Sequence, residues 1–355
     1  MSTSSTVLGA GRLGIGVLRL GPLSVRVHRR GLLVCLLLVA ATLGAVLASL
    51  VLGDIQVGLP RVLLTVFGEG LPVEELIVQD YRLPRVATAA LVGVALGMAG
   101  AVFQTISRNP LGSPDIVGFE TGAATGGLVA MLVVDAGVVG TAAGAVVGGA
   151  LTAVVVFSLA ARGGSDGLRL VLIGVGVGSV LLSFNSMLIV SVNIYDAQGA
   201  GVWLVGNVAG ATWDQVAVLA PAVVVLAALA LLLSRALTMT ELSDGTAVAA
   251  GLPAGRVRVV AGAVGVAMCS VAVAAAGPVA FIALTAPQVA RRLTRASGPN
   301  LVASGLTGAL FLVVADHAAR ELFQPRQVAV GVMTGVVGGL YLAWLLTREW
   351  RSGRA

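Results

Sequence analysis

Residues 82–127 read RLPRVATAALVGVALGMAGAVFQTISRNPLGSPDIVGFETGAATGG, an apolar run between arginines that is followed by a glycine-rich stretch. The part from residue 86 to residue 106 offers about 20 apolar or small residues. A helix that rises about 1.5 Å per residue would cross a hydrocarbon core of roughly 30 Å over that length. We therefore predict a transmembrane helix, with Arg82 and Arg85 at one face of the bilayer and Arg108 at the other.

The whole chain has the composition of a membrane protein. Hydrophobic residues make up 57% of its 355 residues and charged residues only 11%, whereas soluble domains usually carry about 25% charged residues. All 22 basic residues are arginine. A Walker A loop needs a lysine to hold the phosphates. This chain therefore does not hydrolyse ATP through such a loop, and the energy for transport would come from a partner or from an ion gradient.

Ten apolar stretches follow one another, and we predict an all-α fold of about ten transmembrane helices. The predicted spans are residues 31–52, 84–106, 114–135, 137–161, 168–192, 214–235, 257–277, 279–296, 300–318 and 327–347. A cleaved signal peptide is the alternative for the first span, but its apolar run of about 22 residues exceeds the roughly 7 to 15 of a signal sequence. We expect a basic tail over residues 1–30, a membrane domain over 31–348 and a tail over 349–355.

The charges predict which side of the membrane each loop faces. With a cytoplasmic N-terminus, the inner loops carry most of the arginines, as the positive-inside rule requires, and ten spans return the C-terminus to the cytoplasm. The long loop over residues 53–83 would then lie outside. Because the arginines are spread over the ends of the spans and form no basic aromatic face, we expect no nucleic acid partner.

Two stretches differ from ordinary spans. Residues 199–210, GAGVWLVGNVAG, could rise only about 18 Å as a helix, so we predict a re-entrant half-helix that borders a pathway. Residues 241–252, ELSDGTAVAAGL, lie between two inner arginines and predict a short helix in the cytoplasm.

Four motifs carry a resemblance to a known family. They are RLPR (82–85), RNPLGSPD (108–115), ELSDGTAVAAGL (241–252) and APQVARR (286–292). In this wording the chain resembles the FecCD/BtuC-type permeases of bacterial ABC importers for iron-siderophores and vitamin B12. Within that family the wording is most similar to that of the ferric-enterobactin permease subunits.

The resemblance implies a BtuC-like type II importer in the bacterial cytoplasmic membrane, in which this chain forms half of a translocation pathway for ferric siderophores. It implies a second permease subunit, with a different homologous chain favoured over a second copy. It also implies two copies of a cytoplasmic P-loop ATPase and a siderophore-binding lipoprotein or periplasmic protein. ATP and Mg would be bound by the ATPases, and no cofactor by this chain. Haem and cobalamin are alternative cargos of the same scaffold.

Three arginines are candidates for docking the binding protein. Arg82 and Arg85 are predicted at the outer surface, where the positive-inside rule would not place them. Guanidinium groups pair bidentately with carboxylates, and in the resembled family arginines at this position and near the last outer loop meet glutamates of the binding protein. Arg320 matches the second position. Snorkelling to lipid headgroups is the alternative.

The stretch 241–252 resembles the family's coupling segment, usually written L-G-D-x-T-A-x-x-L-G. Glu241 opens it, and the residues that match are Leu242, Asp244, Thr246, Ala247 and Gly251, while Ser243 and Ala250 depart from the pattern. A short rigid element between two spans can pass the motion of an ATPase to the membrane helices. A solvated connecting loop is the alternative.

One predicted helix carries a row of polar residues. Ser179, Ser183 and Ser186, followed by Asn193, recur at steps of four, three and seven and would share one face. Such groups either bond to neighbouring helices or line a wet path. In the resembled permeases this helix lines the channel between two subunits, which favours the path.

Two acids lie close to the membrane. We expect Asp115 to cap the helix that follows it, and Glu120 is either a functional residue or one that reaches water. The two histidines and two cysteines have no ligand spacing, so we expect no metal site.

Two other classes of membrane protein are alternatives. A secondary transporter would want acids near the bilayer midplane, and the middles of the predicted spans lack them. An intramembrane enzyme would want a motif such as H-E-x-x-H or paired intramembrane aspartates, and neither occurs.

Overall fold

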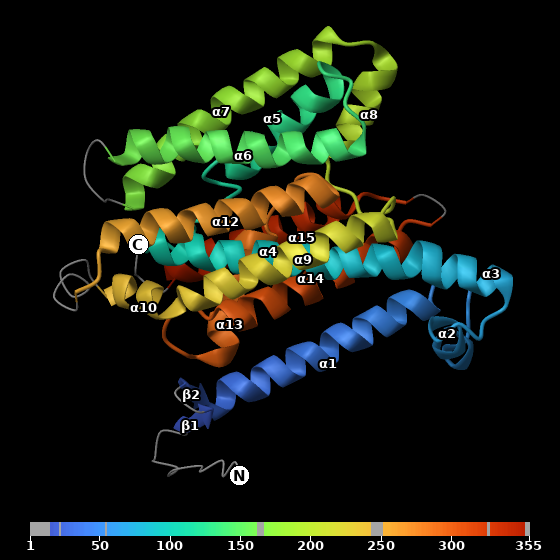
Figure 1. Cartoon of the computed structure of the whole chain (residues 1–355), viewed down its shortest axis with the longest axis horizontal. Helices are drawn as coiled ribbons and strands as arrows, with labels where there is room; N and C mark the ends of the chain where they lie inside the picture. The colour runs from blue at the N-terminus through green and yellow to red at the C-terminus, as the bar shows by residue number, and fades with distance from the viewer. Residues whose placement is uncertain are drawn as a thin grey trace.

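The computed structural model describes residues 15–20, 23–53, 55–161, 167–242, 251–324 and 327–351. In these residues the chain forms a bundle of helices that run back and forth along one long axis, and a two-stranded hairpin lies near the N-terminus (Figure 1). Helices α6 and α7 form one side of the bundle and α1 the other, with α4, α12 and α14 between them (Figure 1). The predicted all-α membrane fold is confirmed.

A hairpin lies within the predicted basic tail over residues 1–30. Its strands are β1 (Ile15–Leu20) and β2 (Leu23–His28), which pair antiparallel with Ile15 opposite His28. The sequence LSVRVH alternates apolar and polar residues, which is the pattern of a strand. Helix α1 follows directly.

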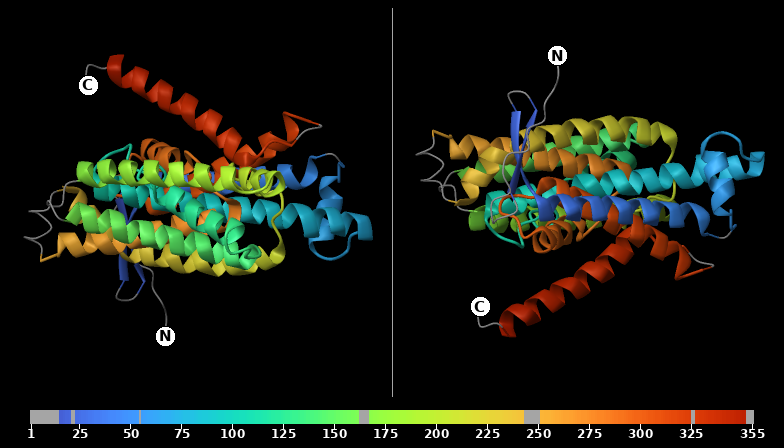
Figure 2. Two further views of the ribbon diagram at one scale, coloured as in Figure 1. Left: turned by 90° about the horizontal axis from the view of Figure 1, so that it is seen from above. Right: turned by 90° about the horizontal axis from the view of Figure 1, so that it is seen from below.

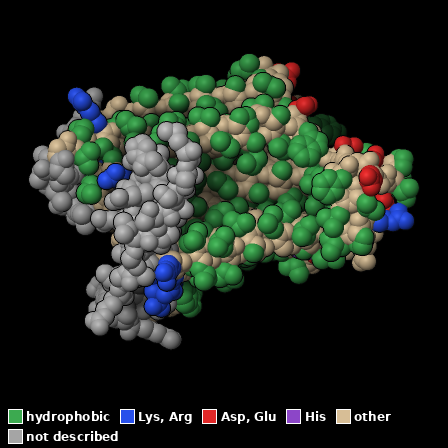
Figure 3. Space-filling view, turned by 60° about the horizontal axis from the view of Figure 1, so that its bottom comes forward, with side chains coloured by type: hydrophobic (Ala, Val, Ile, Leu, Met, Phe, Trp, Pro, Cys, Tyr) green, Lys and Arg blue, Asp and Glu red, His purple; other side chains and the backbone are tan. Residues whose placement is uncertain are grey.

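The long helices agree with the predicted spans to within a few residues. They are α1 (Arg29–Val51), α4 (Leu83–Ser107), α6 (Val138–Ala161), α7 (Gly167–Ser191), α9 (Trp213–Leu232), α12 (Ala254–Ala276), α14 (Leu301–Glu321) and α15 (Val330–Arg351). Among the described residues, 7 helices are long and apolar enough to cross a membrane. Hydrophobic side chains cover much of the face that Figure 3 shows, as a surface that faces lipid requires.

Two predicted spans are only partly helical. Helix α5 (Phe119–Leu132) has 14 residues and α13 (Ile282–Thr294) has 13, which gives each a rise of about 20 Å. Turns and irregular backbone precede them at residues 108–118 and 277–281. Glycines at the ends of these turns take positive φ angles, 80° at Gly118 and 68° at Gly277, which a helix does not tolerate. The predicted spans 114–135 and 279–296 are corrected accordingly.

Residues 53–83, predicted as a loop, are largely helical where the structure describes them. They contain α2 (Leu59–Val66), α3 (Pro72–Glu75) and the π-helical stretch η1 (Leu76–Arg82), which runs into α4. Prolines stand at the first or second position of α2 and α3, where the missing N–H group costs no helical hydrogen bond.

Two further short helices lie at opposite ends of the bundle (Figure 1). The half-helix predicted over 199–210 is α8 (Ile194–Leu204), which begins earlier because the Asn193 side chain caps it. The other is α10 (Ser234–Leu242), which leads into the predicted cytoplasmic segment.

Three helices contact one another backbone to backbone. A Cβ atom at Gly97 of α4 would overlap the carbonyl oxygen of Ser304 on α14, and one at Gly100 would overlap that of Ala283 on α13. Small residues allow membrane helices to approach this closely. Helices α4, α13 and α14 therefore form one tightly packed unit, whereas α15 leaves the bundle at an angle (Figure 2).

The two ends of the bundle differ in charge. Figure 3 shows acidic side chains gathered at one end and most of the visible arginines at the other. We call the end that holds α2 and α3 the acidic end. The opposite end, where α4 and α13 finish and α10 lies, is the basic end.

Candidate functional site

The three arginines proposed for docking lie together at the acidic end. Arg82 ends η1, Arg85 lies in the first turn of α4, and Arg320 lies in the last turn of α14. All three line one pocket of about 300 Å³, to which residues 53 and 55 after α1 also contribute. The contiguous elements η1 and α4, together with the distant helix α14, thus bring three guanidinium groups to one cavity.

Asp316 binds two of these arginines. Its side chain is 2% exposed, and Arg85 donates to it from Nε at 3.1 and 3.0 Å and from Nη2 at 2.9 Å. The Nε atom of Arg320 lies 3.6 Å from Oδ2 of the same carboxylate. Our sequence reasoning missed Asp316. Its signal was an acid inside an apolar helix, four residues before an arginine.

Arg82 donates hydrogen bonds to backbone carbonyls at and just after the end of α1. Its Nη1 donates to the carbonyl oxygen of Leu50 at 2.5 Å and its Nη2 to that of Ile55 at 2.5 Å. Leu50 is in the last turn of α1, where carbonyl groups have no partner within the helix. Arg320 adds a hydrogen bond to the Ser49 hydroxyl. The arginines therefore hold α1 against α4 and α14.

The three arginines proposed for docking are largely buried. Arg82 and Arg85 are each 8% exposed, and Arg320 is 9% exposed. Their burial is compensated by hydrogen bonds: Arg82 donates to the carbonyls of Leu50 in α1 and of Ile55 after it, and Arg85 donates to the Asp316 carboxylate. The three arginines share one pocket, and their docking role stays a prediction.

At the basic end, the predicted coupling segment 241–252 lies only partly in the described residues. Outside them lie Ser243, Asp244, Thr246, Ala247 and Ala250. Glu241 and Leu242 form the end of α10, and Gly251 lies in a turn with a φ angle of 77°. The coupling role stays a prediction, and its two flanks have a defined geometry.

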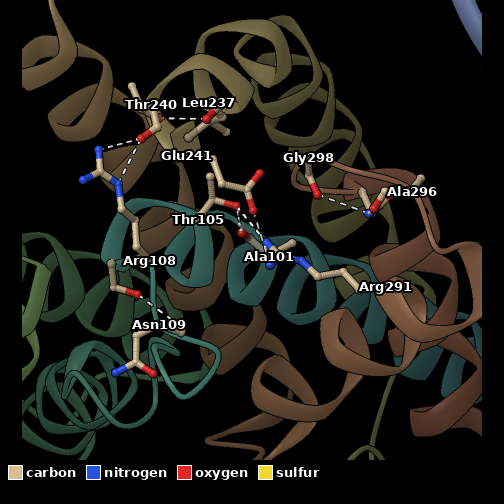
Figure 4. Close-up of polar contacts among 12 residues, drawn as sticks. Ala101, Thr105, Arg108, Asn109, Leu237, Thr240, Glu241, Arg291, Ala296 and Gly298 are labelled. Atoms are coloured by element: carbon tan, nitrogen blue, oxygen red, sulfur yellow. Dashed lines mark hydrogen bonds and ion pairs between the residues drawn. The ribbon is translucent and has the colours of Figure 1, made fainter. Parts of the chain in front are cut away.

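Side chains from two other helices hold the end of α10 (Figure 4). Arg108 donates to the carbonyl oxygen of Thr240 from Nε at 3.0 Å and from Nη2 at 2.7 Å. Glu241 forms an ion pair with Arg291 at 3.4 Å, and Arg291 also donates to the Thr105 hydroxyl at 3.2 Å. The last turn of α10 is thus attached to α4 and to α13. Sequence reasoning assigned neither Arg108 nor Arg291 such a contact.

The serines of α7 face away from the rest of the chain. Ser179, Ser183 and Ser186 are exposed, and their hydroxyl groups donate to carbonyl oxygens four residues earlier at 2.9, 3.0 and 3.0 Å. Asn193 does not continue this row, because α7 ends at Ser191 and the Asn193 side chain accepts from the first backbone N–H groups of α8. The predicted polar face therefore consists of the three serines.

The two acids near the membrane bind the broken start of α13. Asp115 does not cap α5 as we expected; its Oδ2 accepts from the Phe281 N–H at 3.3 Å. Glu120 is 5% exposed and accepts from the Val279 N–H, so the reading in which it reaches water is wrong. Both acids accept hydrogen bonds from backbone N–H groups in the turn before α13, which have no partners within a helix.

Comparison with known proteins identifies the family. The model of the FecCD transport family matches residues 37–348. The chain belongs to the FecCD transport family. As a member, it is a multi-pass membrane transport permease.

Individual relatives extend over nearly the whole chain. The ferric enterobactin transport system permease protein FepG of Escherichia coli (strain K12) is 41% identical over 328 residues, which are 92% of this chain and 99% of that protein. The Fe(3+) dicitrate transport system permease protein FecD of the same strain is 35% identical and covers 87% of this chain and 96% of its own length.

A solved structure has the same fold. It is a metal-chelate type ABC transporter in an inward-facing conformation, with a TM-score of 0.80 and 24% sequence identity, and the match covers 89% of this FecCD chain and 99% of the other.

Proposed function

We propose that this FecCD chain is a translocation subunit of an ATP-driven ABC importer for ferric siderophores. The observation that carries the proposal is the 41% identity to a ferric enterobactin permease over 99% of that protein. The fold agrees with that of an ABC transporter permease. Haem or cobalamin is the alternative cargo, because specificity in such systems resides largely in the protein that delivers the ligand.

The exposed serines of α7 support the proposal that this chain forms half of a pathway. Three hydroxyl groups on one exposed face, bonded only to their own helix in the described part of the chain, offer weak polar contacts. A bulky polar chelate can slide along such a surface without binding tightly. The other half of the pathway would come from a second permease subunit, preferably a different homologous chain.

The pocket at the acidic end suits an anionic anchor of a binding protein. Three arginines and one acid, Glu321, line it, and the buried carboxylate of Asp316 lies between two of the arginines. A glutamate of an extracytoplasmic binding protein would find guanidinium groups there that are already oriented. On this proposal the acidic end lies outside the cell and the basic end lies in the cytoplasm, which accords with the positive-inside rule.

The basic end would receive the ATPases. We assign energy coupling to residues 241–252, with ATP and Mg bound by two copies of a cytoplasmic ATPase. The attachment of α10 to α4 and α13 supports this assignment, because a motion imposed on the segment then acts on packed helices and not on a free loop.

Transport by the reconstituted complex tests the proposal. The permeases, the ATPase and the binding protein are placed in proteoliposomes, and uptake of radiolabelled ferric chelates is measured. We expect uptake that requires ATP and the binding protein and that survives an uncoupler. Uptake that is abolished by the uncoupler but independent of ATP would support a secondary transporter instead. Uptake of haem or cobalamin in place of ferric chelates would overturn the assignment of ferric siderophores as the cargo.

A further inference from the structure

Arg108 closes the helix from which the coupling segment continues. Its side chain is exposed, and two of its N–H groups converge on the carbonyl oxygen of Thr240 at 3.0 and 2.7 Å. Thr240 is 1% exposed. Its carbonyl belongs to the last turn of α10, where carbonyl groups have no helical donor. A guanidinium group supplies that donor and also suits the negative end of the helix dipole.

The backbone at this position makes an arginine unexpected. Arg108 follows the last residue of α4 and has a φ angle of 51°, in the left-handed region. Glycine is usual at such a helix end because it has no Cβ atom to strain. The hydrogen bonds to Thr240 give a reason for an arginine here, because its side chain donates to the Thr240 carbonyl and glycine has no side chain that could.

A second contact lies beside the first. Glu241, the next residue of α10, forms an ion pair with Arg291 of α13 at 3.4 Å, and Arg291 also donates to Thr105 in the last turn of α4. Figure 4 shows that Arg108 and Arg291 approach this end of α10 from different helices. Two neighbouring residues are thus attached to two helices that are themselves closely packed.

We propose that Arg108 is a positioning residue for energy coupling: by capping α10 at Thr240, it ties the coupling segment to α4. Helix α4 carries Arg85 of the acidic-end pocket in its first turn and Arg108 directly after its last. A displacement of α10 is then passed to the helix that forms part of the docking pocket. The inference rests on the proposed function and names the joint through which the ATPase would act.

Hydrogen exchange on the purified full-length chain in lipid nanodiscs tests the cap without any partner. We expect Arg108→Gln to increase deuterium uptake in peptides from the last turn of α10, by about tenfold in exchange rate for the loss of a charge-assisted bond. Arg108→Lys keeps the charge but not the planar fork, so it should restore only part of the protection. Arg256→Gln, which removes an exposed arginine at the start of α12, is the control and should change nothing there.

Stimulation of the ATPase tests the coupling role. In the reconstituted complex, we expect Arg108→Gln to lower the ATPase rate at saturating binding protein by about tenfold. The concentration of binding protein that gives half of the effect should stay unchanged, because the acidic end is untouched. A mere loss of stability would not be expected to lower the ATPase rate and leave the half-maximal concentration of binding protein unchanged.

Each result decides the question. Unchanged exchange in Arg108→Gln would overturn the cap, and equal losses in Arg256→Gln would show that only positive charge matters at this end. Normal stimulation in Arg108→Gln would overturn the coupling role. If the wild-type complex shows no stimulation, the proposed function fails, while the exchange experiment still decides whether Arg108 closes α10.

Discussion

Replacing Asp316 should destabilise the acidic end of the bundle more than any surface change. Asp316 is 1% exposed and lies between Arg85 and Arg320, which are 8% and 9% exposed. In Asp316→Ala, two buried guanidinium groups lose their shared counter-charge. Removal of one partner from a buried ion pair costs about 3–5 kcal/mol. Asp316→Asn keeps the shape and one acceptor and should cost less.

Thermal unfolding of the purified chain in nanodiscs measures this effect. At about 2 °C per kcal/mol, the lower end for larger chains, Asp316→Ala should lower the apparent midpoint by about 6–10 °C. Asp135→Asn is the matched control, because Asp135 is exposed and has a φ angle of 52°, which asparagine tolerates well. It should change the free energy of unfolding by less than about 0.5 kcal/mol.

A double mutant separates the charge from the packing. If Arg320 is left without its counter-charge in Asp316→Ala, the further change Arg320→Gln should cost less in that background than in the wild type, with a coupling of about 1–3 kcal/mol. A midpoint for Asp316→Ala within about 2 °C of wild type, or costs that simply add, would show that the carboxylate does not hold the two arginines.

Three further predictions concern other parts of the bundle. Gly100→Ala should cost about 1–3 kcal/mol in thermal unfolding, because its Cβ would overlap the Ala283 carbonyl oxygen, whereas Gly176→Ala, whose Cβ would enter open space, should cost nothing; equal effects would contradict the packing of α4 on α13. Ser183→Leu should lower chelate uptake at unchanged stability, whereas Ser183→Ala should retain most of it, since Ser183 is exposed on α7; normal uptake by Ser183→Leu would remove this face from the pathway. Asn193→Ala should weaken the start of α8 by about 1 kcal/mol and speed its hydrogen exchange, whereas Asn193→Asp keeps the acceptor; unchanged exchange in Asn193→Ala would refute the cap.

The sequence predicted the long helices well and their interruptions poorly. Helices α4 and α12 begin and end close to the predicted spans because the length of an apolar run is a local property. The starts of α5 and α13 were missed, although both follow glycine and proline, because apolar residues fill the broken segments as well. Hydropathy predicts whether a residue lies in an apolar environment. It does not predict whether the backbone of that residue is helical.

The sequence by itself determined that this chain lies in a membrane, that it has no lysine for a Walker A loop and that its motifs are those of a permease family. Only the tertiary structure decided what the arginines bind. Arg85 meets Asp316 across 231 residues, and Arg108 meets Thr240 across 132. Such pairs depend on which helices become neighbours in the bundle. Which helices become neighbours depends on small residues and close backbone contacts along the whole chain. It cannot be read from any single stretch of sequence.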